Sequence, residues 1–441
     1  MARTTFPALL PLISLIPYLV TAANPSGSWG QATVSINNSI YVHGGEGVSG
    51  TISNLYTLDS SQPWSTANPP WTDLTSNAGT FTVPQTALQA MWPAADGKSF
   101  YIWGGGNDYH ITQAQSGFAQ YNVITGTWSL PSAISGMPVQ RKDLRAAWSS
   151  SGVVYLWAGW GDMYTGYTTS NSTNYIFTEM ATFDTTKLIW NVFNVTNTTG
   201  QVPPPRVAHT ATMLSNGQMV IIGGLIGTQL NETYVDLNFA AMTDIPVFDT
   251  YTTTWTLRNA TGNTPDVRRY SAAVLSSDGL SIIICSGGTQ SSKVLLNGVA
   301  VLDSRTWSWT QPAISGTLPT PRMGHSAVMV NGQMIVFFDN RRRRRRRPPS
   351  PTPPTPTPIP RKPPGTTTPW PTPLPSHHPT TLPLPHPQCL IFRWARRTRI
   401  LMASPTHRLG TLLFPTLRSI IMPSRPTRTA MARILHPLGQ S

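Results

Sequence analysis

The chain has 441 residues, with 31 Lys and Arg against 17 Asp and Glu, and its charge is divided very unevenly. Residues 341–441 hold 18 of the basic residues and no acidic one, so residues 1–340 carry a formal charge of −4. A nucleic-acid-binding body is excluded, because attraction to phosphate needs clustered Lys and Arg. Charged residues make up 11% of the chain, against roughly 25% in a typical soluble domain, which disfavours an ordinary cytosolic enzyme.

Residues 1–23 have the pattern of a secretory signal peptide. Arg3 precedes an uncharged apolar run over residues 6–20, and Ala22 and Ala23 end it with small side chains. A membrane anchor is the alternative, but the run is too short and too often broken by proline to cross a bilayer. We therefore expect a secreted or extracellular cell-surface protein, with no membrane span in this chain.

Six Asn-x-Ser/Thr sequons agree with export and predict a glycoprotein. The acceptor residues are Asn37, Asn171, Asn194, Asn197, Asn231 and Asn259. The two cysteines, Cys285 and Cys389, lie in different regions, so the chain lacks the framework of a small disulfide-stapled domain.

An apolar run that ends in glycines recurs along residues 29–340. Five copies end at Gly44-Gly45, Gly104-Gly105, Ala158-Gly159, Gly223-Gly224 and Gly287-Gly288. Runs of this kind fit inner strands that are buried on both faces. Paired glycines allow a sharp turn and a close approach of neighbouring backbone. A sixth run, residues 334–338, lacks the glycines.

A second signal follows each full run, an Asp or Asn that precedes a Trp by about six positions. The tryptophans are Trp64, Trp128, Trp190, Trp255 and Trp309. The acidic or amide side chain suits a turn, and the Trp suits an outer strand whose indole N–H reaches a carbonyl. A third signal, Pro-Arg followed by a His, precedes two later runs at Arg206 and Arg322, and Arg145 and Arg269 are weaker equivalents. A period near 50–65 residues is typical of propeller blades.

These residues resemble kelch repeats, the four-stranded blades of the kelch β-propeller, a fold group that includes the central domain of galactose oxidase. The resemblance covers the body of the chain and is similar to secreted or cell-surface kelch proteins of fungi. It implies an all-β, kelch-type propeller of about six blades over residues 24–338. The last blade is expected to be incomplete, because its glycines and its Asp–Trp turn are missing.

Residues 339–441 differ abruptly from the body. Seven arginines, 341–347, are followed by Pro-Thr repeats, a composition that predicts a disordered basic Pro-rich tail. Ring closure needs a complete last blade, so our hypothesis is a frameshift or splice artefact in this region. The alternative is a genuine tail that binds an acidic cell-wall polymer, nucleic acid or an anionic membrane surface.

The resemblance also raises an alternative function, that of a copper carbohydrate oxidase of the galactose oxidase type. Copper(II) needs a cluster of imidazole and oxygen ligands. The histidines of the body are His43, His110, His209 and His325, and the repeat explains two of them as structural. We predict no catalytic residue, no metal site and no cofactor, because fold kinship alone is a weak warrant for an activity.

The loop after the third glycine run is the candidate binding site. It contains Trp157, Trp160, Asp162, Tyr164 and Tyr167. Aromatic rings beside an acid suit a glycan or a protein partner. The alternative is that the rings cover the core beneath a long loop. The predicted function is a non-catalytic, monomeric scaffold that binds protein or cell-wall polysaccharide through its propeller loops.

Overall fold

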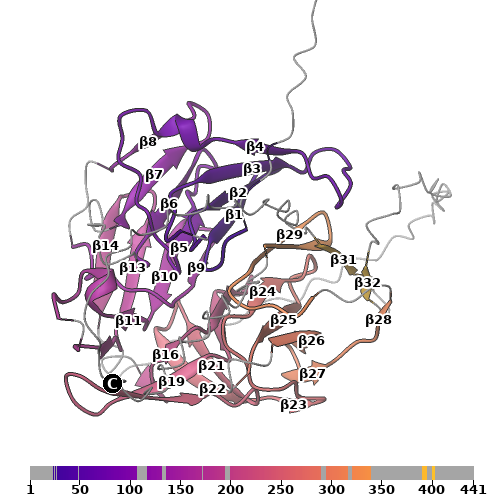
Figure 1. Ribbon diagram of the computed structural model, residues 1–441. Coiled ribbons are helices and arrows are strands. Elements are labelled where there is room, and N and C mark those ends of the chain that lie inside the picture. The colour runs from indigo at the N-terminus through magenta and orange to yellow at the C-terminus, as the bar shows by residue number, and fades with distance from the viewer. Residues whose placement is uncertain are drawn as a thin grey trace, which may run out of the picture.

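The computed structural model describes residues 23, 25, 27–47, 49–106, 117–131, 136–170, 172–193, 199–289, 295–315, 320–338, 390–394 and 400–402. These residues form a β-propeller in which six antiparallel sheets surround a central axis (Figure 1). The prediction of an all-β, kelch-type propeller is thereby confirmed. No helix in the described segments is both long and apolar enough to cross a bilayer.

Each blade contains four strands that run outward from the axis in chain order. The innermost strands are β1 (Ala32–Ile36), β5 (Ala90–Pro93), β9 (Ala146–Trp148), β17 (Thr210–Met213), β24 (Ala272–Leu275) and β29 (Ser326–Val330). The second strands are β2 (Ser39–His43), β6 (Ser99–Trp103), β10 (Val153–Trp157), β18 (Gln218–Ile222), β25 (Ser281–Gly288) and β30 (Gln333–Phe337). The glycine-ended runs of the sequence are therefore second strands, one position further from the axis than the innermost strand.

The outer half of each blade is built from two further strands. The third strands are β3 (Leu55–Asp59), β7 (Ala119–Asn122), β13 (Met180–Asp184), β21 (Asp244–Asp249), β26 (Leu295–Asp303) and β31 (Leu390–Trp394). The fourth strands are β4 (Trp71–Asp73), β8 (Thr127–Ser129), β14 (Ile189–Phe193), β22 (Thr254–Asn259), β27 (Ser308–Thr310) and β32 (Ile400–Met402). In the last three blades a short strand pairs in parallel with the fourth strand. These are β15 (Thr199–Gly200), β23 (Thr261–Gly262) and β28 (Ile314–Ser315).

The innermost strands close into a ring. Each lies against the innermost strand of the next blade, and β29 of blade 6 lies against β1 of blade 1. Apolar clusters fill the six spaces between neighbouring blades. The cluster that closes the ring packs Ile40, Val42 and Trp71 of blade 1 against Ile335 and Phe337 of blade 6. Burial of this apolar surface and hydrogen bonds such as Ser326 Oγ to Gln31 O, at 2.8 Å, join the two ends of the ring.

The sixth blade differs from the expectation that it would stop at its inner strands. Strand β31 pairs with β30, with Met334 opposite Phe392, and β32 pairs with β31. Both strands come from the segment expected to be a disordered tail, and the remaining residues of that tail lie outside the described residues. The physical reason for the pairing is that β30 would otherwise present an unpaired edge of backbone donors and acceptors.

Two small sheets stand beside blades 3 and 4. The first pairs β11 (Trp160–Gly161) with β12 (Tyr175–Ile176). The second places β19 (Leu225–Gln229) between β16 (Arg206–Val207) and β20 (Val235–Phe239). Strands β12 and β19 are neighbours, so the long loops of the two blades form one continuous structure. The described residues also include the 3-10 helices η1 (Thr75–Ala78) and η3 (Met163–Thr165).

Candidate functional site

A belt of six residues with left-handed backbone surrounds one end of the axis. Each residue precedes an innermost strand, and each donates its N–H to the carbonyl of the belt residue in the preceding blade, at 2.6–3.3 Å. The belt consists of Gly30, Leu88, Asp143, Ala208, Tyr270 and Gly324, whose φ values lie between 52° and 68°. The six hydrogen bonds form a closed circle, so the loops of all six blades are tied together around the axis.

The paired glycines bring the second strands close to the segments that lead into the next blade. Gly105 donates its N–H to the carbonyl of Arg141, and Gly224 does the same to Arg268, both at 2.9 Å. A Cβ on Gly224 would lie 2.5 Å from the carbonyl oxygen of Val207. Backbone contact of this kind leaves no room for a side chain. In the fifth blade the left-handed pair is Ser286-Gly287 rather than Gly287-Gly288, because a bulge shifts the register of β25.

Four buried arginines stand in equivalent positions of the leading segments, and each donates to the carbonyl that ends a second strand. They are Arg141, Arg206, Arg268 and Arg322, whose acceptors are Ala158, Gly223, Ser286 and Phe338. The sequence interpretation of Arg145 and Arg269 as members of this set is therefore wrong, because the matching arginines stand four positions and one position earlier. Burial lowers the pKa of Arg206 to about 10, opposed by its ion pair with Asp244 at 2.6 Å.

The histidines of the body are contacts between blades. His209 packs against the Trp157 ring at 5.7 Å. His325 Nε2 lies 3.3 Å from Cys285 Sγ, and His43 lies 3.3 Å from the amide of Gln89. Burial lowers the pKa of His43 and of His209 to about 3, so both rings are neutral at physiological pH. His110 lies outside the described residues. Within the described segments no three His, Cys, Asp or Glu side chains gather as metal ligands.

The repeat tryptophans lie on the fourth strands, with one exception. Trp128, Trp190, Trp255 and Trp309 stand opposite Tyr121, Phe183, Phe248 and Leu302 of the third strands. In blade 1 the same position, opposite Leu58, belongs to Trp71. The assignment of Trp64 to this position is wrong, because the connection after Asp59 is longer in blade 1. Only part of the indole prediction is met: Trp309 Nε1 donates to Met242 O at 2.7 Å, whereas Trp190 and Trp255 Nε1 have no partner among described residues.

The predicted binding loop divides into a buried part and an accessible part. Trp157 ends β10 with 1% of its surface exposed, packed 4.9 Å from the Trp255 ring. It belongs to the core between blades 3 and 4, so its assignment to a binding surface is wrong. Trp160, Tyr164 and Tyr167 are half-buried. They retain exposed ring surface and remain candidates.

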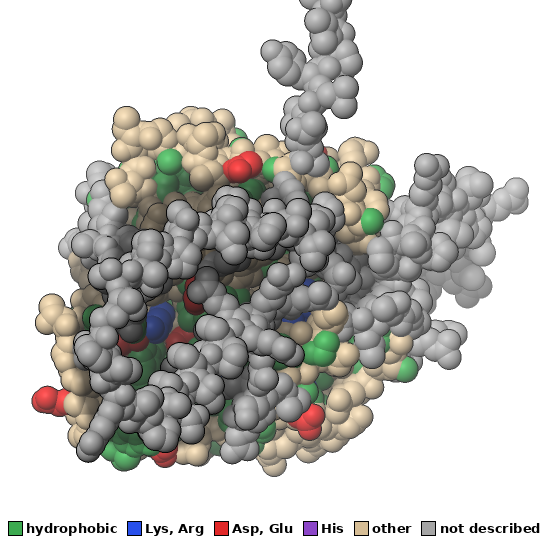
Figure 2. Space-filling model, viewed as in Figure 1, with side chains coloured by type: hydrophobic (Ala, Val, Ile, Leu, Met, Phe, Trp, Pro, Cys, Tyr) green, Lys and Arg blue, Asp and Glu red, His purple; other side chains and the backbone are tan. Residues whose placement is uncertain are grey.

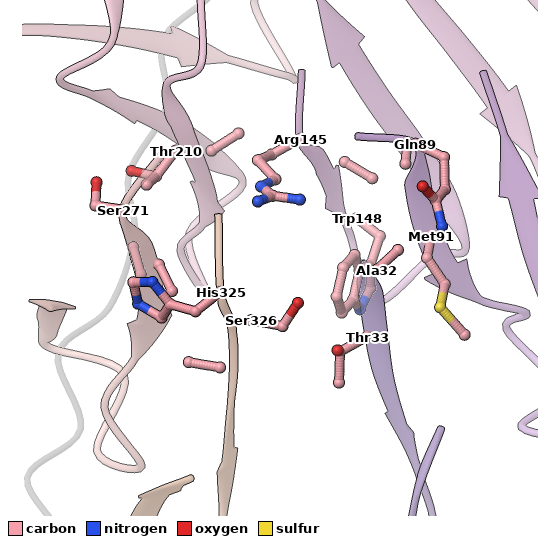
Figure 3. A pocket seen from close by; sticks show the side chains of 16 residues that line it. Ala32, Thr33, Gln89, Met91, Arg145, Trp148, Thr210, Ser271, His325 and Ser326 are labelled. Carbon is pink, nitrogen blue, oxygen red and sulfur yellow. The ribbon is translucent and has the colours of Figure 1, made fainter. Parts of the chain in front are cut away.

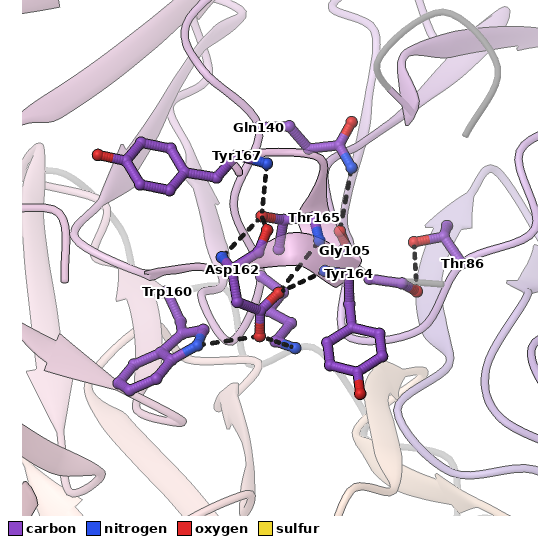
Figure 4. Close-up of polar contacts among 10 residues, drawn as sticks. Thr86, Gly105, Gln140, Trp160, Asp162, Tyr164, Thr165 and Tyr167 are labelled. Carbon is purple, nitrogen blue, oxygen red and sulfur yellow. Dashed lines mark hydrogen bonds and ion pairs between the residues drawn. The ribbon is translucent and has the colours of Figure 1, made fainter. Parts of the chain in front are cut away.

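Asp162 organises the accessible part of the loop (Figure 4). Its carboxylate caps η3 by accepting the N–H groups of Tyr164 and Thr165, and it accepts the indole N–H of Trp160 at 3.0 Å. It also forms an ion pair with Lys142 at 2.6 Å, and the Lys142 ammonium lies 5.1 Å from the Tyr164 ring centre. A buried carboxylate with this many partners holds the aromatic side chains in fixed positions.

The loop continues into a wider apolar surface, which we call the aromatic platform: Trp160, Tyr164, Tyr167, Tyr175, Leu230 and Tyr234. Tyr167 stacks on Tyr175 at 5.2 Å. Leu230 and Tyr234 lie at the β19–β20 turn with 59% and 54% of their surface exposed. The blade 3 and blade 4 parts of the platform are joined by two hydrogen bonds. Gln229 donates to Asn174 O at 2.9 Å, and Asn174 donates to Thr233 O at 3.1 Å.

The remaining predictions concern glycans and charge. Asn37, Asn231 and Asn259 are exposed, while Asn171, Asn194 and Asn197 lie outside the described residues, and glycosylation stays a prediction. Figure 2 shows that the acidic and basic side chains visible on that face stand singly rather than in one patch.

Comparison with known proteins agrees with this geometry. The chain matches the family model of the "KLHDC2/KLHL20/DRC7 Kelch-repeats domain" over residues 32–243 and 236–338. It is 28% identical to Kelch domain-containing protein 3 of Rattus norvegicus over 261 residues, 55% of this chain and 61% of the relative. It is 24% identical to the host cell factor homolog hcf-1 of Caenorhabditis elegans over 248 residues, 54% of this chain and 29% of the relative.

A third relative, acyl-CoA-binding domain-containing protein 4 of Arabidopsis thaliana, is 28% identical over 152 residues, 34% of this chain and 20% of the relative. The chain thus spans between a fifth and about three fifths of the length of these relatives.

Proposed function

This chain belongs to the kelch-repeat family, and we propose on that premise that it is a non-catalytic scaffold that binds a protein partner through one propeller face. The observation that carries the proposal is the aromatic platform. It joins the long loops of blades 3 and 4, and Leu230 and Tyr234 expose more than half of their surface there. Exposed Tyr and Trp held by a rigid frame are typical anchors of protein interfaces.

A cell-wall polysaccharide is the second candidate partner, favoured by the same rings. Tyr167 stacks on Tyr175 beside the half-buried Trp160, and sugar rings pack on aromatic faces in this way. The two candidates differ in what they need. A protein interface would use the projecting Leu230 and Tyr234, whereas a sugar would use the flat surface around Trp160.

The test compares two variants that remove exposed large side chains from opposite ends of blade 4. Leu230→Ala/Tyr234→Ala alters the platform, while Tyr251→Ala alters a tyrosine that is 81% exposed in the β21–β22 turn. Both should retain the wild-type urea midpoint, because exposed substitutions change stability little. Cross-linking on intact cells with mass spectrometry measures protein partners, and calorimetry with soluble β-glucan and chitin oligomers measures sugars.

We expect one protein to be cross-linked by the wild type and by Tyr251→Ala but not by the platform variant. Equal cross-linking by all three chains would refute the platform as the binding surface. Heat exchange with the oligosaccharides that is lost in Trp160→Ala and kept in Leu230→Ala/Tyr234→Ala would favour the polysaccharide.

We also propose that the protein is secreted or displayed at the cell surface. The support is the sequence of residues 1–23 together with the exposed sequons Asn37, Asn231 and Asn259. Protein recovered from the medium or cell surface should begin near Ala23 or Asn24 and lose mass on enzymatic removal of N-glycans. An intact Met1 in glycan-free intracellular protein would contradict the proposal.

A further inference from the structure

The innermost strands enclose a channel along the propeller axis, distinct from the aromatic platform. The channel contains a cavity of about 130 Å³ whose wall comes from all six blades (Figure 3). Small side chains such as Ala146, Ala211 and Ala273 make the space. A single water needs about 10–15 Å³, so the cavity has room for several waters or for one small ion.

Arg145 brings a positive charge into this cavity. Arg145 follows the belt residue Asp143 by two positions, and the residues at the matching positions of the other five blades are small and uncharged: Ala32, Ala90, Thr210, Ala272 and Ser326. The leading segments are equal in length, with four steps from Arg141 to Arg145 and four from Arg206 to Thr210, so blade 3 differs in the side chain at this position. Arg145 points toward the axis, as Figure 3 shows.

The guanidinium of Arg145 has no hydrogen bond and no ion pair with any residue that the structure describes. Arg141 and Arg206, by contrast, are each paired with an acid at 2.6–2.7 Å. Burial lowers the pKa of Arg145, and the negative charge of Asp143 opposes that shift. A guanidinium withdrawn from bulk water without hydrogen-bond partners is costly, so water or a bound anion must solvate it.

Other polar atoms along the same wall also lack partners among the described residues. They include His325 Nδ1 and Gln89 Oε1, and both side chains border the cavity. Both nitrogens of the buried His209 beside the belt are unpartnered as well. The pKa of His325 is held well below its usual value by burial and by the charges of Arg322 and Arg145. The neutral ring keeps one N–H that can donate to an acceptor at the axis.

We propose that the axial channel binds one small oxyanion, of the class of inorganic phosphate, sulfate or a free carboxylate, on the guanidinium of Arg145. The planar fork of an arginine matches two oxygens of such an anion. Hydroxyl groups of the wall, for example Ser271, supply further donors at the same level. Asp143 is the nearby acid, and burial raises its pKa, opposed by the charge of Lys142 and by a hydrogen bond from Tyr270.

The experiment measures the thermal midpoint of the full chain with sodium phosphate, sodium sulfate or sodium acetate, each against sodium chloride at equal ionic strength. A ligand that binds only the folded state raises the midpoint as its concentration passes the dissociation constant. We expect at least one oxyanion to raise the midpoint above the chloride value in the wild type. Arg145→Gln, which removes the positive charge and keeps a polar side chain, should abolish the increase. Arg305→Gln, on an exposed arginine paired with Asp303, is the matched control and should retain it.

Two results would overturn the proposal: no oxyanion effect beyond chloride in the wild type, or an effect that Arg145→Gln retains. If Arg145→Gln does not fold, a crystal of the wild type grown with selenate decides the matter. Anomalous selenium density beside Arg145 supports the site, and its absence at a selenate concentration that raises the midpoint refutes it.

Discussion

Two tryptophans at equivalent positions allow the energy of one buried hydrogen bond to be measured inside this protein. Trp309 and Trp255 both lie on fourth strands and are 1% and 2% exposed. Trp309 Nε1 donates to Met242 O at 2.7 Å, whereas Trp255 Nε1 has no partner in the described part of the chain. Replacement of each by Phe removes the same atoms from two apolar clusters.

The expected difference follows from the hydrogen bond. Trp309→Phe leaves a buried carbonyl without its donor, which costs about 1–3 kcal/mol. Trp255→Phe removes an N–H that was already unpaired, so it carries no such cost. The loss of ring volume is common to both and cancels to first order. Trp309→Phe should therefore be the less stable variant by about 2 kcal/mol, a factor of roughly 30 in the unfolding equilibrium.

Urea unfolding followed by circular dichroism measures this difference. If the two variants have equal dependence of unfolding free energy on urea concentration but different urea midpoints, the change lies in stability rather than in the denatured state. Free energies of unfolding that agree to within about 0.5 kcal/mol would refute the reasoning, because they would show that the two indoles are solvated alike. The double variant is the control for independence, and its loss should equal the sum of the single losses.

Three further outcomes are expected. His209 has its pKa lowered to about 3 by burial, so the unfolded state binds more protons between that pH and about 6.5. The contribution of His209 to the free energy of unfolding is fully present above pH 6.5 and falls by about 1.4 kcal/mol per pH unit toward pH 3. His209→Gln should therefore flatten the curve of urea midpoint against pH over this range. Gly105→Ala should cost more than about 3 kcal/mol, because φ is +81° and the new Cβ would lie 2.7 Å from Ala87 O. Gly298→Ala, with nothing within 4 Å, should change the midpoint little, and equal losses would contradict the argument. Burial raises the pKa of Cys285 to about 12, so in a Cys389→Ser background the folded protein should not react with a disulfide reagent at pH 8 until urea unfolds it.

The accuracy of the sequence interpretation varied with the kind of signal. Fold class and blade number could be predicted because glycine and tryptophan recur in each blade for the same structural reason. Glycine stands where a neighbour's backbone leaves no room for a Cβ, as at Gly105 and Gly224, and tryptophan fills the space between blades. Where a loop changed length the same reasoning failed. The long connection after Asp59 moved the equivalent position to Trp71, and the bulge in β25 moved the left-handed pair to Ser286-Gly287.

The candidate sites were harder to predict. Asp162, Tyr164 and Tyr167 lie together because they are local in sequence, whereas their neighbour Trp157 faces the core at the end of β10. The hairpin that carries Leu230 and Tyr234 was not predicted as part of a site, although its loop is long for a kelch blade connection. Arg145 was assigned to the wrong position, because the equivalent arginine is Arg141, and only its hydrogen bond to Ala158 O identifies it.

Local chemistry therefore specified the blades, because strand periodicity, turn residues and glycine requirements act over a few positions and repeat with the chain. Long-range geometry decided the rest. The belt of Gly30, Leu88, Asp143, Ala208, Tyr270 and Gly324 shares a backbone conformation rather than a side-chain type, so no motif reveals it. The same holds for the closing strands β31 and β32 and for the axial position of Arg145. Each depends on segments far apart in the chain that meet only when six blades close around one axis.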